Sequence, residues 1–197
     1  MVKEDITGVI LAGGQATRMG GQDKGLLQIN DQPMIVHVIN ALKPQVAEIL
    51  INANRNKNIY GKFGYPVIAD DLTGFQGPLA GMAAAMNHTS TDYIFTCPCD
   101  GPLLPTGIVA RLHTVLSRQE AEICVVHDGK RMQSVYALID CQLQDSLREF
   151  LACGGRKIEH WYEQHNLAQA DFSEMQDNFL NVNEQRDLAV VSVHFTD

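Results

Sequence analysis

The sequence has little that would suit an oxidising compartment or a membrane. Its five cysteines are an odd number and lack the spacing of a disulfide framework. No apolar stretch reaches the ~18 residues that a membrane-spanning helix needs. The first residues also lack the basic start, apolar run and cleavage site of a secretory signal. We therefore expect a cytoplasmic protein with no membrane partner.

Basic residues are also scarce. The chain has 15 Lys and Arg against 23 Asp and Glu, which gives a formal net charge of −8. An acidic chain repels the phosphates of nucleic acids and membranes, so we expect no nucleic-acid partner. A small anionic substrate can still bind where a few cations gather in one pocket.

Repeats, low-complexity tracts and linkers are absent too. A length of 197 residues suits a single domain over residues 1–197. Hydrophobic residues make up 45% of the chain and charged residues 19%, which is typical of a globular protein with a sizeable core.

What the sequence does contain is an alternation of short apolar runs and helical spacings. The apolar runs predict strands at residues 6–11, 49–53, 67–69, 93–97, 122–127, 133–139 and 179–182. The helical spacings fall at residues 35–42, 78–86, 104–116, 143–151 and 158–164, and a last helix is expected from about residue 183. This alternation predicts an α/β fold with a mostly parallel central sheet and helices on both faces.

Four of the expected strands end in glycine or in a polar residue. In open α/β sheets, ligands bind outside the carboxyl ends of the strands. The residues at these ends are Gly13, Asn52, Asp70 and Asp100. This pattern indicates a site that handles phosphate.

A glycine-rich loop follows the first expected strand. Residues 11–25 read Leu-Ala-Gly-Gly-Gln-Ala-Thr-Arg-Met-Gly-Gly-Gln-Asp-Lys-Gly. Glycines let backbone N–H groups approach phosphate oxygens, while Arg18 offers a forked cation and Lys24 a point charge. The alternative is an ordinary strand-to-helix turn with incidental charges.

Two better-known phosphate loops do not match this one. A Walker A loop needs Gly-Lys followed by Ser or Thr, whereas Lys24 stands between Asp23 and Gly25. The GxGxxG fingerprint of dinucleotide-binding folds is absent from the loop. Neither a P-loop NTPase nor a classical dehydrogenase is favoured.

The loop resembles the motif Leu-Ala-Gly-Gly-x-x-x-Arg-Met-Gly-x-x-Lys of the nucleoside-triphosphate transferase superfamily. Its Leu-Ala-Gly-Gly start, with Asp rather than Pro before the lysine, is similar to the molybdenum cofactor guanylyltransferase family. The resemblance continues along most of the chain, through residues 52–55, 77–81, 97–100, 127–129, 155–157 and 181–183.

This resemblance implies a Rossmann-like nucleotidyltransferase layout and a reaction. The family transfers GMP from GTP to the terminal phosphate of Mo-molybdopterin, which forms Mo-molybdopterin guanine dinucleotide and releases pyrophosphate. It implies Mg²⁺ held by Asp100 and catalytic roles for Arg18, Lys24 and Asp100. The implied GTP-binding residues are Leu11, Ala12, Gly13, Lys24, Asn52, Asp70 and Asp100, and the implied acceptor-binding residues are Arg156, Lys157, Asn181 and Asn183.

Most of these roles have a simpler alternative. Asp100 can cap a helix that begins near Pro105, and Asn183 can cap the last helix. Adjacent side chains on an extended chain point to opposite faces, so only one of Asp70 and Asp71 can face a nucleotide. Asn52 can be a turn residue, and Arg156 with Lys157 can be a solvated pair at a helix start.

Other activities also stay open. A CTP-dependent pterin cytidylyltransferase, a sugar-phosphate nucleotidyltransferase and a non-catalytic GTP-binding module for cofactor delivery are the alternatives. The chain departs from the family at residues 184–186, commonly Thr-Pro-Glu, and at Gln133-Ser134, often Gln-Pro or His-Pro. Transient contacts with molybdenum cofactor synthesis proteins are expected on pathway grounds alone, and residues 190–197 carry no functional signal.

Overall fold

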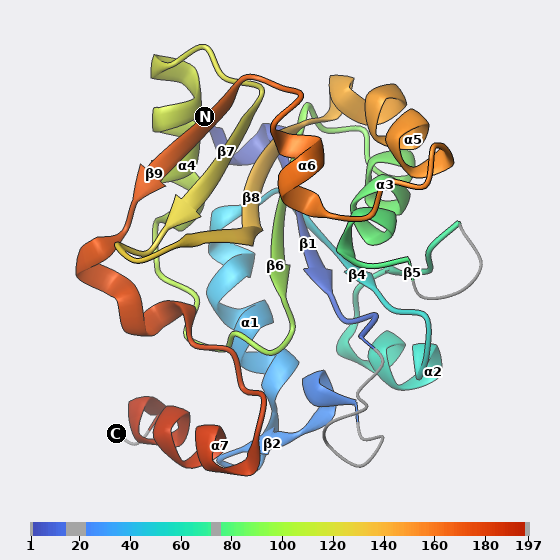
Figure 1. Ribbon diagram of the computed structural model, residues 1–197. Coiled ribbons are helices and arrows are strands. Elements are labelled where there is room, and N and C mark those ends of the chain that lie inside the picture. The colour runs from blue at the N-terminus through green and yellow to red at the C-terminus, as the bar shows by residue number, and fades with distance from the viewer. Residues whose placement is uncertain (1, 15–22, 72–75, 196–197) are drawn as a thin grey trace.

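One mixed sheet forms the centre of the molecule. The computed structural model describes residues 2–14, 23–71 and 76–195 (Figure 1). The strand order is β5 (Val67–Ile68), β4 (Glu48–Asn52), β1 (Ile6–Leu11), β6 (Tyr93–Pro98), β8 (Met132–Asp140), β7 (Ile123–His127) and β9 (Leu167–Asp171). All neighbouring strands are parallel except β8, which runs antiparallel to β6 and β7. The predicted α/β fold with a mostly parallel sheet is confirmed.

Helices cover both faces of this sheet, as predicted. The helices are α1 (Met34–Leu42), α2 (Lys57–Tyr60), α3 (Pro78–His88), α4 (Ile108–Arg118), α5 (Gln144–Ala152), α6 (Ile158–Tyr162) and α7 (Gln185–Ser192). Short 3-10 turns lie at Val2–Asp5, Lys24–Leu26, Lys43–Gln45, Gly61–Phe63, Cys141–Leu143, Ser173–Phe179 and Val193–Phe195. In the described part of the chain, no helix has the length and apolar character needed to cross a bilayer.

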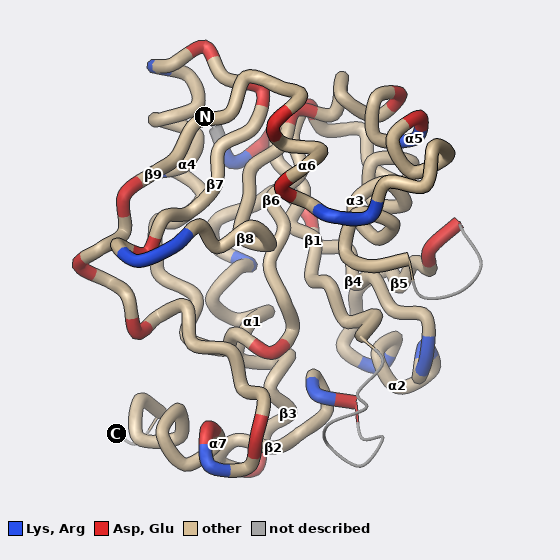
Figure 2. The backbone as a smooth tube through the Cα atoms, viewed as in Figure 1, with Lys and Arg blue, Asp and Glu red and all other residues tan. Residues whose placement is uncertain are grey.

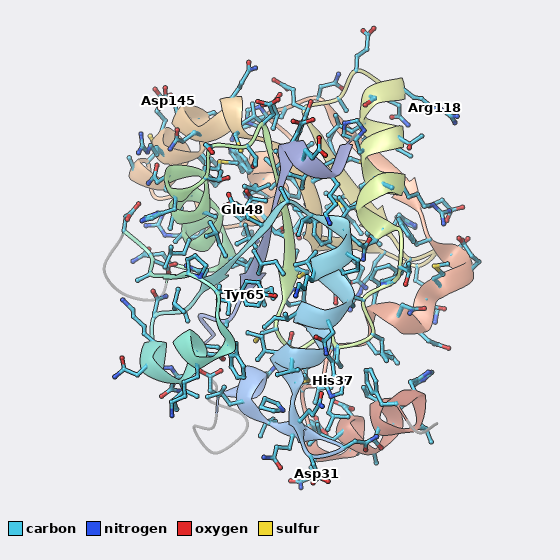
Figure 3. The ribbon with its side chains drawn as sticks, turned by 180° about the vertical axis from the view of Figure 1, so that it is seen from behind. Asp31, His37, Glu48, Tyr65, Arg118 and Asp145 are labelled. Carbon is cyan, nitrogen blue, oxygen red and sulfur yellow. The ribbon has the colours of Figure 1, made fainter. Side chains whose placement is uncertain are left out.

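Side-chain alternation along the strands produces two separate cores. Ile10 of β1 packs in one cluster with residues of α1 and α4, whereas its neighbour Val9 packs in another with residues of α3, α5 and α6. Successive strand residues point to opposite faces, so fully buried strands need apolar residues at nearly every position. Figure 3, seen from behind, brings α1 and α4 in front of the sheet.

A small hairpin was not predicted. Strands β2 (Gln28–Ile29) and β3 (Gln32–Pro33) pair antiparallel. Asn30 and Asp31 join them with φ of 47° and 63°. Asn and Asp tolerate the positive φ that a tight hairpin turn requires at both central positions. The hairpin leads into α1, whose predicted start at Pro33 is confirmed because Pro33 is its N-cap.

The predicted strand at residues 179–182 is wrong. This stretch lies outside the sheet, and its first residue, Phe179, is the last residue of the 3-10 turn Ser173–Phe179. The last strand is instead β9 (Leu167–Asp171), which pairs parallel with β7 and buries only Ala168 and Ala170. Two alanines give a weak apolar signal, so the bulkier apolar residues at 179–182 were predicted as the last strand instead of β9.

Two helix starts also differ from the prediction. Helix α4 begins at Ile108 rather than near residue 104, because Gly107 precedes it in the left-handed region with φ of 79°. Helix α7 begins at Gln185, and Glu184 rather than Asn183 is its N-cap. Glu184 and Asp187 form a capping box there, in which the side chain of each residue accepts a hydrogen bond from the backbone N–H of the other.

The turn between β7 and β8 depends on one buried carboxylate. Asp128 accepts hydrogen bonds from the N–H groups of Lys130 and Arg131, each at 2.8 Å, and from the Gln133 side chain at 2.6 Å. Burial opposes ionisation of Asp128, but these hydrogen bonds outweigh it and lower the pKa of its carboxyl.

We expect Asp128→Asn to destabilise the fold by about 2 kcal/mol at pH 7, since hydrogen bonds to a charged group are lost. The folded pKa lies below the ordinary value near 4, so this contribution is complete above about pH 4. It is lost as the pH falls through the folded pKa. Urea denaturation at pH 7 and pH 3 should therefore show a smaller difference from wild type at pH 3.

Asp145→Asn is the matched control, because the Asp145 side chain is 89% exposed. An Asp128→Asn protein as stable as wild type at pH 7 would contradict this account of the turn.

Candidate functional site

A cavity lies at the carboxyl ends of β1, β4, β5 and β6. Its volume is about 430 Å³, and it is lined by Leu11, Gly13, Gly14, Asn52, Asp70, Gln76, Gly77, Pro78, Pro98 and Val135. The register of the sheet places Leu11 opposite both Asn52 and Pro98, so the three strands end at the same level. Four residues predicted to bind nucleotide therefore share one cavity: Leu11, Gly13, Asn52 and Asp70.

Ala12, Lys24 and Asp100 are the three predicted nucleotide residues that do not line this cavity. Ala12 is buried, and its N–H donates to the Asn52 carbonyl at 2.8 Å. The Leu11 carbonyl likewise accepts from the Cys99 N–H at 3.1 Å. These bonds extend the sheet pairing past the strand ends, so the backbone of residues 11–12 supports the cavity wall.

A polar network holds the Asp70 carboxylate on the cavity wall. Asn52 donates to Oδ1 of Asp70 at 2.9 Å, and Asn54 donates to Oδ2 at 2.8 Å. The Asp70 N–H in turn donates to Oδ1 of Asn54 at 2.9 Å. Asp71 instead pairs with Asn87 near another cavity, so Asp70 is the one of the two that lines the main cavity.

Asn54 is a site residue to which sequence reasoning gave no role. It fixes Asp70 from two directions, through its amide nitrogen and its amide oxygen. Its position in the matched stretch 52–55 was the only signal. The same stretch contains Arg55, whose guanidinium donates to the Gly14 carbonyl at 2.9 Å and so brings a cation to the start of the glycine-rich loop.

Helix α3 presents its N-terminus to the cavity. Gly77 and Pro78 line the cavity, and Gly77 has a φ of 80° that only glycine adopts readily. Pro78 occupies the first turn, where a missing N–H costs nothing. The free N–H groups and the dipole at a helix N-terminus favour an anionic ligand.

A second cluster joins three distant parts of the chain. The Lys24 ammonium donates to Oδ2 of Asp100 at 2.9 Å and to Oδ1 of Asn183 at 2.7 Å. The segment containing Asn183 is held beside Asp100 by a 2.8 Å hydrogen bond from the Val182 N–H to the Asp100 carbonyl. Asp100 does not cap α4, which begins at Ile108 after Gly107.

Two buried polar atoms lie just beneath this cluster. The Tyr136 hydroxyl and Oδ1 of Asn181 make no hydrogen bond among the described residues. Both approach Gly101, where an added Cβ would lie 1.9 Å from the hydroxyl and 3.3 Å from the amide oxygen. Burial, with smaller contributions from Cys97 and Asp100, raises the pKa of Tyr136 well above its ordinary value, so the phenol stays neutral.

The donor set around Asp100 fits a hard cation that shares its ligands with a substrate. The described residues contain no group of three or more His, Cys, Asp or Glu side chains able to hold a metal by themselves. Mg²⁺ commonly takes one or two carboxylates together with substrate phosphates. Burial raises the pKa of the Cys97 and Cys99 thiols, which disfavours thiolate ligation at this strand end.

The predicted acceptor residues are divided between two sides of the site. Arg156 borders the main cavity, because its Nε donates to the side chain of Gln76, a lining residue. Lys157 is exposed at the start of α6 and makes no capping hydrogen bond. Figure 2 shows this basic pair as a blue stretch between α5 and α6. Asn181 and Asn183 belong instead to the segment that precedes α7, and Asn183 accepts a hydrogen bond from Lys24.

Arg18 lies outside the described residues, so its predicted place in the loop has no structural account. The remaining arrangement is a partly open cavity with amide and carboxylate groups, next to a lysine paired with an aspartate. Such a site can bind the base and sugar of a nucleotide in the cavity and direct its phosphates towards the lysine.

Comparison with known proteins identifies relatives over most of the chain. Residues 8–169 match the model of the "MobA-like NTP transferase domain". The molybdenum cofactor guanylyltransferases of Shewanella loihica and Shewanella sediminis are each 53% identical over 178 residues, which cover 90% of this chain and 91% of each relative.

Solved structures share the fold at lower identity. Molybdopterin-guanine dinucleotide biosynthesis protein A from Archaeoglobus fulgidus superposes with a TM-score of 0.81 at 18% identity, covering 96% of this chain and 98% of that one. A 4-diphosphocytidyl-2C-methyl-D-erythritol synthase from Anaerococcus prevotii gives 0.74 at 9% identity, covering 98% and 96%. At these identities the likeness shows the fold alone.

We expect Gly81→Ala to distort the cavity wall. A Cβ at residue 81 would lie 2.4 Å from Oδ1 of Asn52 and 2.9 Å from Cδ2 of Leu11. Overpacking of this kind costs about 1–3 kcal/mol, and the displaced Asn52 side chain should lose its bond to Asp70. Thermal unfolding and the NMR signal of the Asn52 side-chain amide measure the two effects.

Gly61→Ala is the control, because no atom lies within 4 Å of the added Cβ there. If both variants kept the wild-type melting temperature and amide signal, the close approach at Gly81 would not matter.

Proposed function

Because this chain belongs to the MobA-like NTP transferase family, we propose that it transfers GMP from GTP to the terminal phosphate of Mo-molybdopterin and releases pyrophosphate. The chain is a nucleotidyltransferase of the molybdenum cofactor guanylyltransferase type. The observation that supports the residue roles best is the cavity at the strand ends, beside the cluster of Lys24, Asp100 and Asn183.

In this proposal the guanosine part of GTP occupies the cavity. Asn52 and Asp70 offer donors and acceptors at its wall, and Gly13 leaves room for close approach of the nucleotide. The triphosphate extends towards Lys24, and the glycine-rich loop supplies N–H groups for its oxygens. Arg18 in this loop would add a forked cation.

The chemical step needs positioning and charge neutralisation more than proton transfer. A terminal phosphate oxygen of the acceptor attacks the α-phosphorus of GTP in line, and the bond from that phosphorus to the bridging oxygen of pyrophosphate breaks. A phosphate monoester has a second pKa of about 6, so it is largely ionised at neutral pH and needs no general base. Lys24 would stabilise the charge that spreads over the phosphate oxygens.

Asp100 would hold Mg²⁺, with the Asn183 amide oxygen in the same cluster. When bound, this ion would neutralise charge on the triphosphate and on the departing pyrophosphate. Lys24 would then turn from Asp100 towards the phosphates, which its flexible stem permits. In this account the ion pair between Lys24 and Asp100 holds both groups in place before substrate binds.

The acceptor would bind across the phosphate end of the nucleotide, between the C-terminal segment and the edge of the cavity near Gln76. Asn181 and Asn183 lie beside the Lys24–Asp100 pair, and Arg156 borders the cavity through Gln76. These residues and Lys157 are proposed to bind the pterin substrate. A cytoplasmic location and transient contacts with cofactor-synthesis proteins belong to the same proposal, and the five free cysteines fit that location.

The reaction is tested by pyrophosphate release from purified protein with Mg²⁺ and molybdenum-loaded molybdopterin. We expect release with GTP and at least tenfold less with CTP, a difference of about 1.4 kcal/mol or more in transition-state binding. Release that favours CTP would indicate a cytidylyltransferase. Tight GTP binding without release would indicate a wrong acceptor or a cofactor-delivery module.

We expect Asp100→Asn to lower the rate on the order of 10²–10³-fold, as the loss of one preorganised charge-stabilising group does. The amide keeps the shape of the side chain but loses the charge that a metal requires. Asp71→Asn is the matched control, because Asp71 pairs with Asn87 away from the main cavity. An Asp100→Asn enzyme with wild-type, magnesium-dependent turnover would rule out the metal role.

A further inference from the structure

A buried carboxylate directly precedes Lys24 in the chain. Asp23 is only 8% exposed, and both of its oxygens accept hydrogen bonds from the segment around α2. The Tyr60 hydroxyl donates to Oδ1 at 2.5 Å, and the Asn56 side chain donates to Oδ2 at 3.2 Å. Burying a carboxylate is costly unless it is well hydrogen-bonded, so these two donors fix the position of Asp23.

Gly25, the residue after Lys24, packs closely against the same tyrosine. A Cβ at residue 25 would lie 2.7 Å from the Tyr60 hydroxyl and 3.2 Å from Sγ of Cys99. The backbone between these points is also tied, because the carbonyls of Asp23 and Lys24 accept from the N–H groups of Leu26 and Leu27 at 3.0 and 3.1 Å. The backbone of Lys24 is therefore held from both sides.

Tyr60 is well suited to act as a permanent donor. Its side chain is fully buried in the core cluster that includes residues of α1. Burial, followed by smaller effects of Cys99 and Asp23, raises the pKa of the phenol. The hydroxyl thus keeps its proton, and the hydrogen bond runs from Tyr60 to Asp23.

We propose that Asp23, Asn56 and Tyr60 form an anchor that positions Lys24 for the transfer step, with Tyr60 as its central positioning residue. Lysine has a long flexible stem, so the place of its backbone decides whether the ammonium can pair with Asp100 and Asn183 before substrate binds and then reach the substrate phosphates. The kinetic part of this inference rests on the proposed guanylyl transfer.

Tyr60→Phe removes the central donor but keeps the buried ring. We expect kcat to fall about tenfold, since small misplacements of a catalytic group are costly, while the KM for GTP stays within about twofold. The matched control is Tyr162→Phe, which removes another buried tyrosine hydroxyl with a 2.9 Å hydrogen bond, to the Ser134 carbonyl. A loss that is general to buried hydroxyls would appear equally in the control.

A double-mutant cycle with Lys24 separates positioning from general damage to the fold. Lys24→Ala should cost on the order of 10²–10³ in rate. If Tyr60 acts through Lys24, adding Tyr60→Phe to Lys24→Ala should cost nothing further, because the two changes remove the same interaction. Additive losses would overturn the proposal.

A readout without turnover keeps this inference distinct from the proposed reaction. In wild type the Lys24 side chain is 22% exposed and its ammonium is paired twice. Acylation by an amine-reactive ester, followed by mass spectrometry, should modify Lys24 several-fold faster in Tyr60→Phe than in wild type or Tyr162→Phe. Lys130, on the exposed β7–β8 turn, serves as the internal reference.

Asn56→Gly provides a second variant in case Tyr60→Phe folds poorly. Asn56 is exposed and has a φ of 52°, which glycine adopts without strain, so the change removes mainly the donor to Asp23. We expect faster Lys24 acylation here too. Wild-type acylation rates in both variants would overturn the anchor, whereas absent pyrophosphate release by wild type would count against the proposed reaction alone.

Discussion

The parallel pairing of β1 between β4 and β6 is the constraint on which the site depends. Leu11 is in register with Asn52 on one side and with Pro98 on the other. Backbone hydrogen bonds continue this pairing beyond the strand ends, from Ala12 to Asn52 and from Cys99 to Leu11. Three chain segments therefore leave the sheet at one level. Their next residues form the cavity wall and place Asp100 beside it.

The C-terminal segment adds Asn183 to the cluster of Lys24 and Asp100 at the edge of the sheet. A single backbone hydrogen bond, from Val182 to Asp100, brings Asn183 within 2.7 Å of the Lys24 ammonium. The capping box of α7 fixes the chain just after Asn183. Lys24 thus lies between the cavity proposed to bind the nucleotide and the segment proposed to bind the acceptor, and the residue before it, Asp23, accepts a hydrogen bond from the buried Tyr60 of α2. Lys24 therefore connects the strand end that contains Asp100, the C-terminal segment that contains Asn183 and the region around α2.

Much of this arrangement could be predicted from local signals. In β1 every residue before Leu11 is buried. This stretch reads as a short apolar run, and the strand predicted at residues 6–11 has the observed bounds. Asn52, Asp70 and Asp100 stood at predicted strand ends, where parallel sheets bind ligands. The family motif then gave these residues expected roles. β9 escaped because two buried alanines carry little periodic signal, and the apolar run at 179–182 was taken for a strand instead.

By itself, the sequence determined the class of fold and the family, because these depend on local periodicity and on a contiguous motif. Tertiary structure decided which polar side chains meet. Asn183 reaches Lys24 across 159 positions, and Tyr60 reaches Asp23 across 37. It also decided that Asn54 fixes Asp70 and that Asp71 pairs elsewhere. Such pairings depend on how distant segments pack and on which buried groups must satisfy one another, and neither leaves a local pattern in the chain.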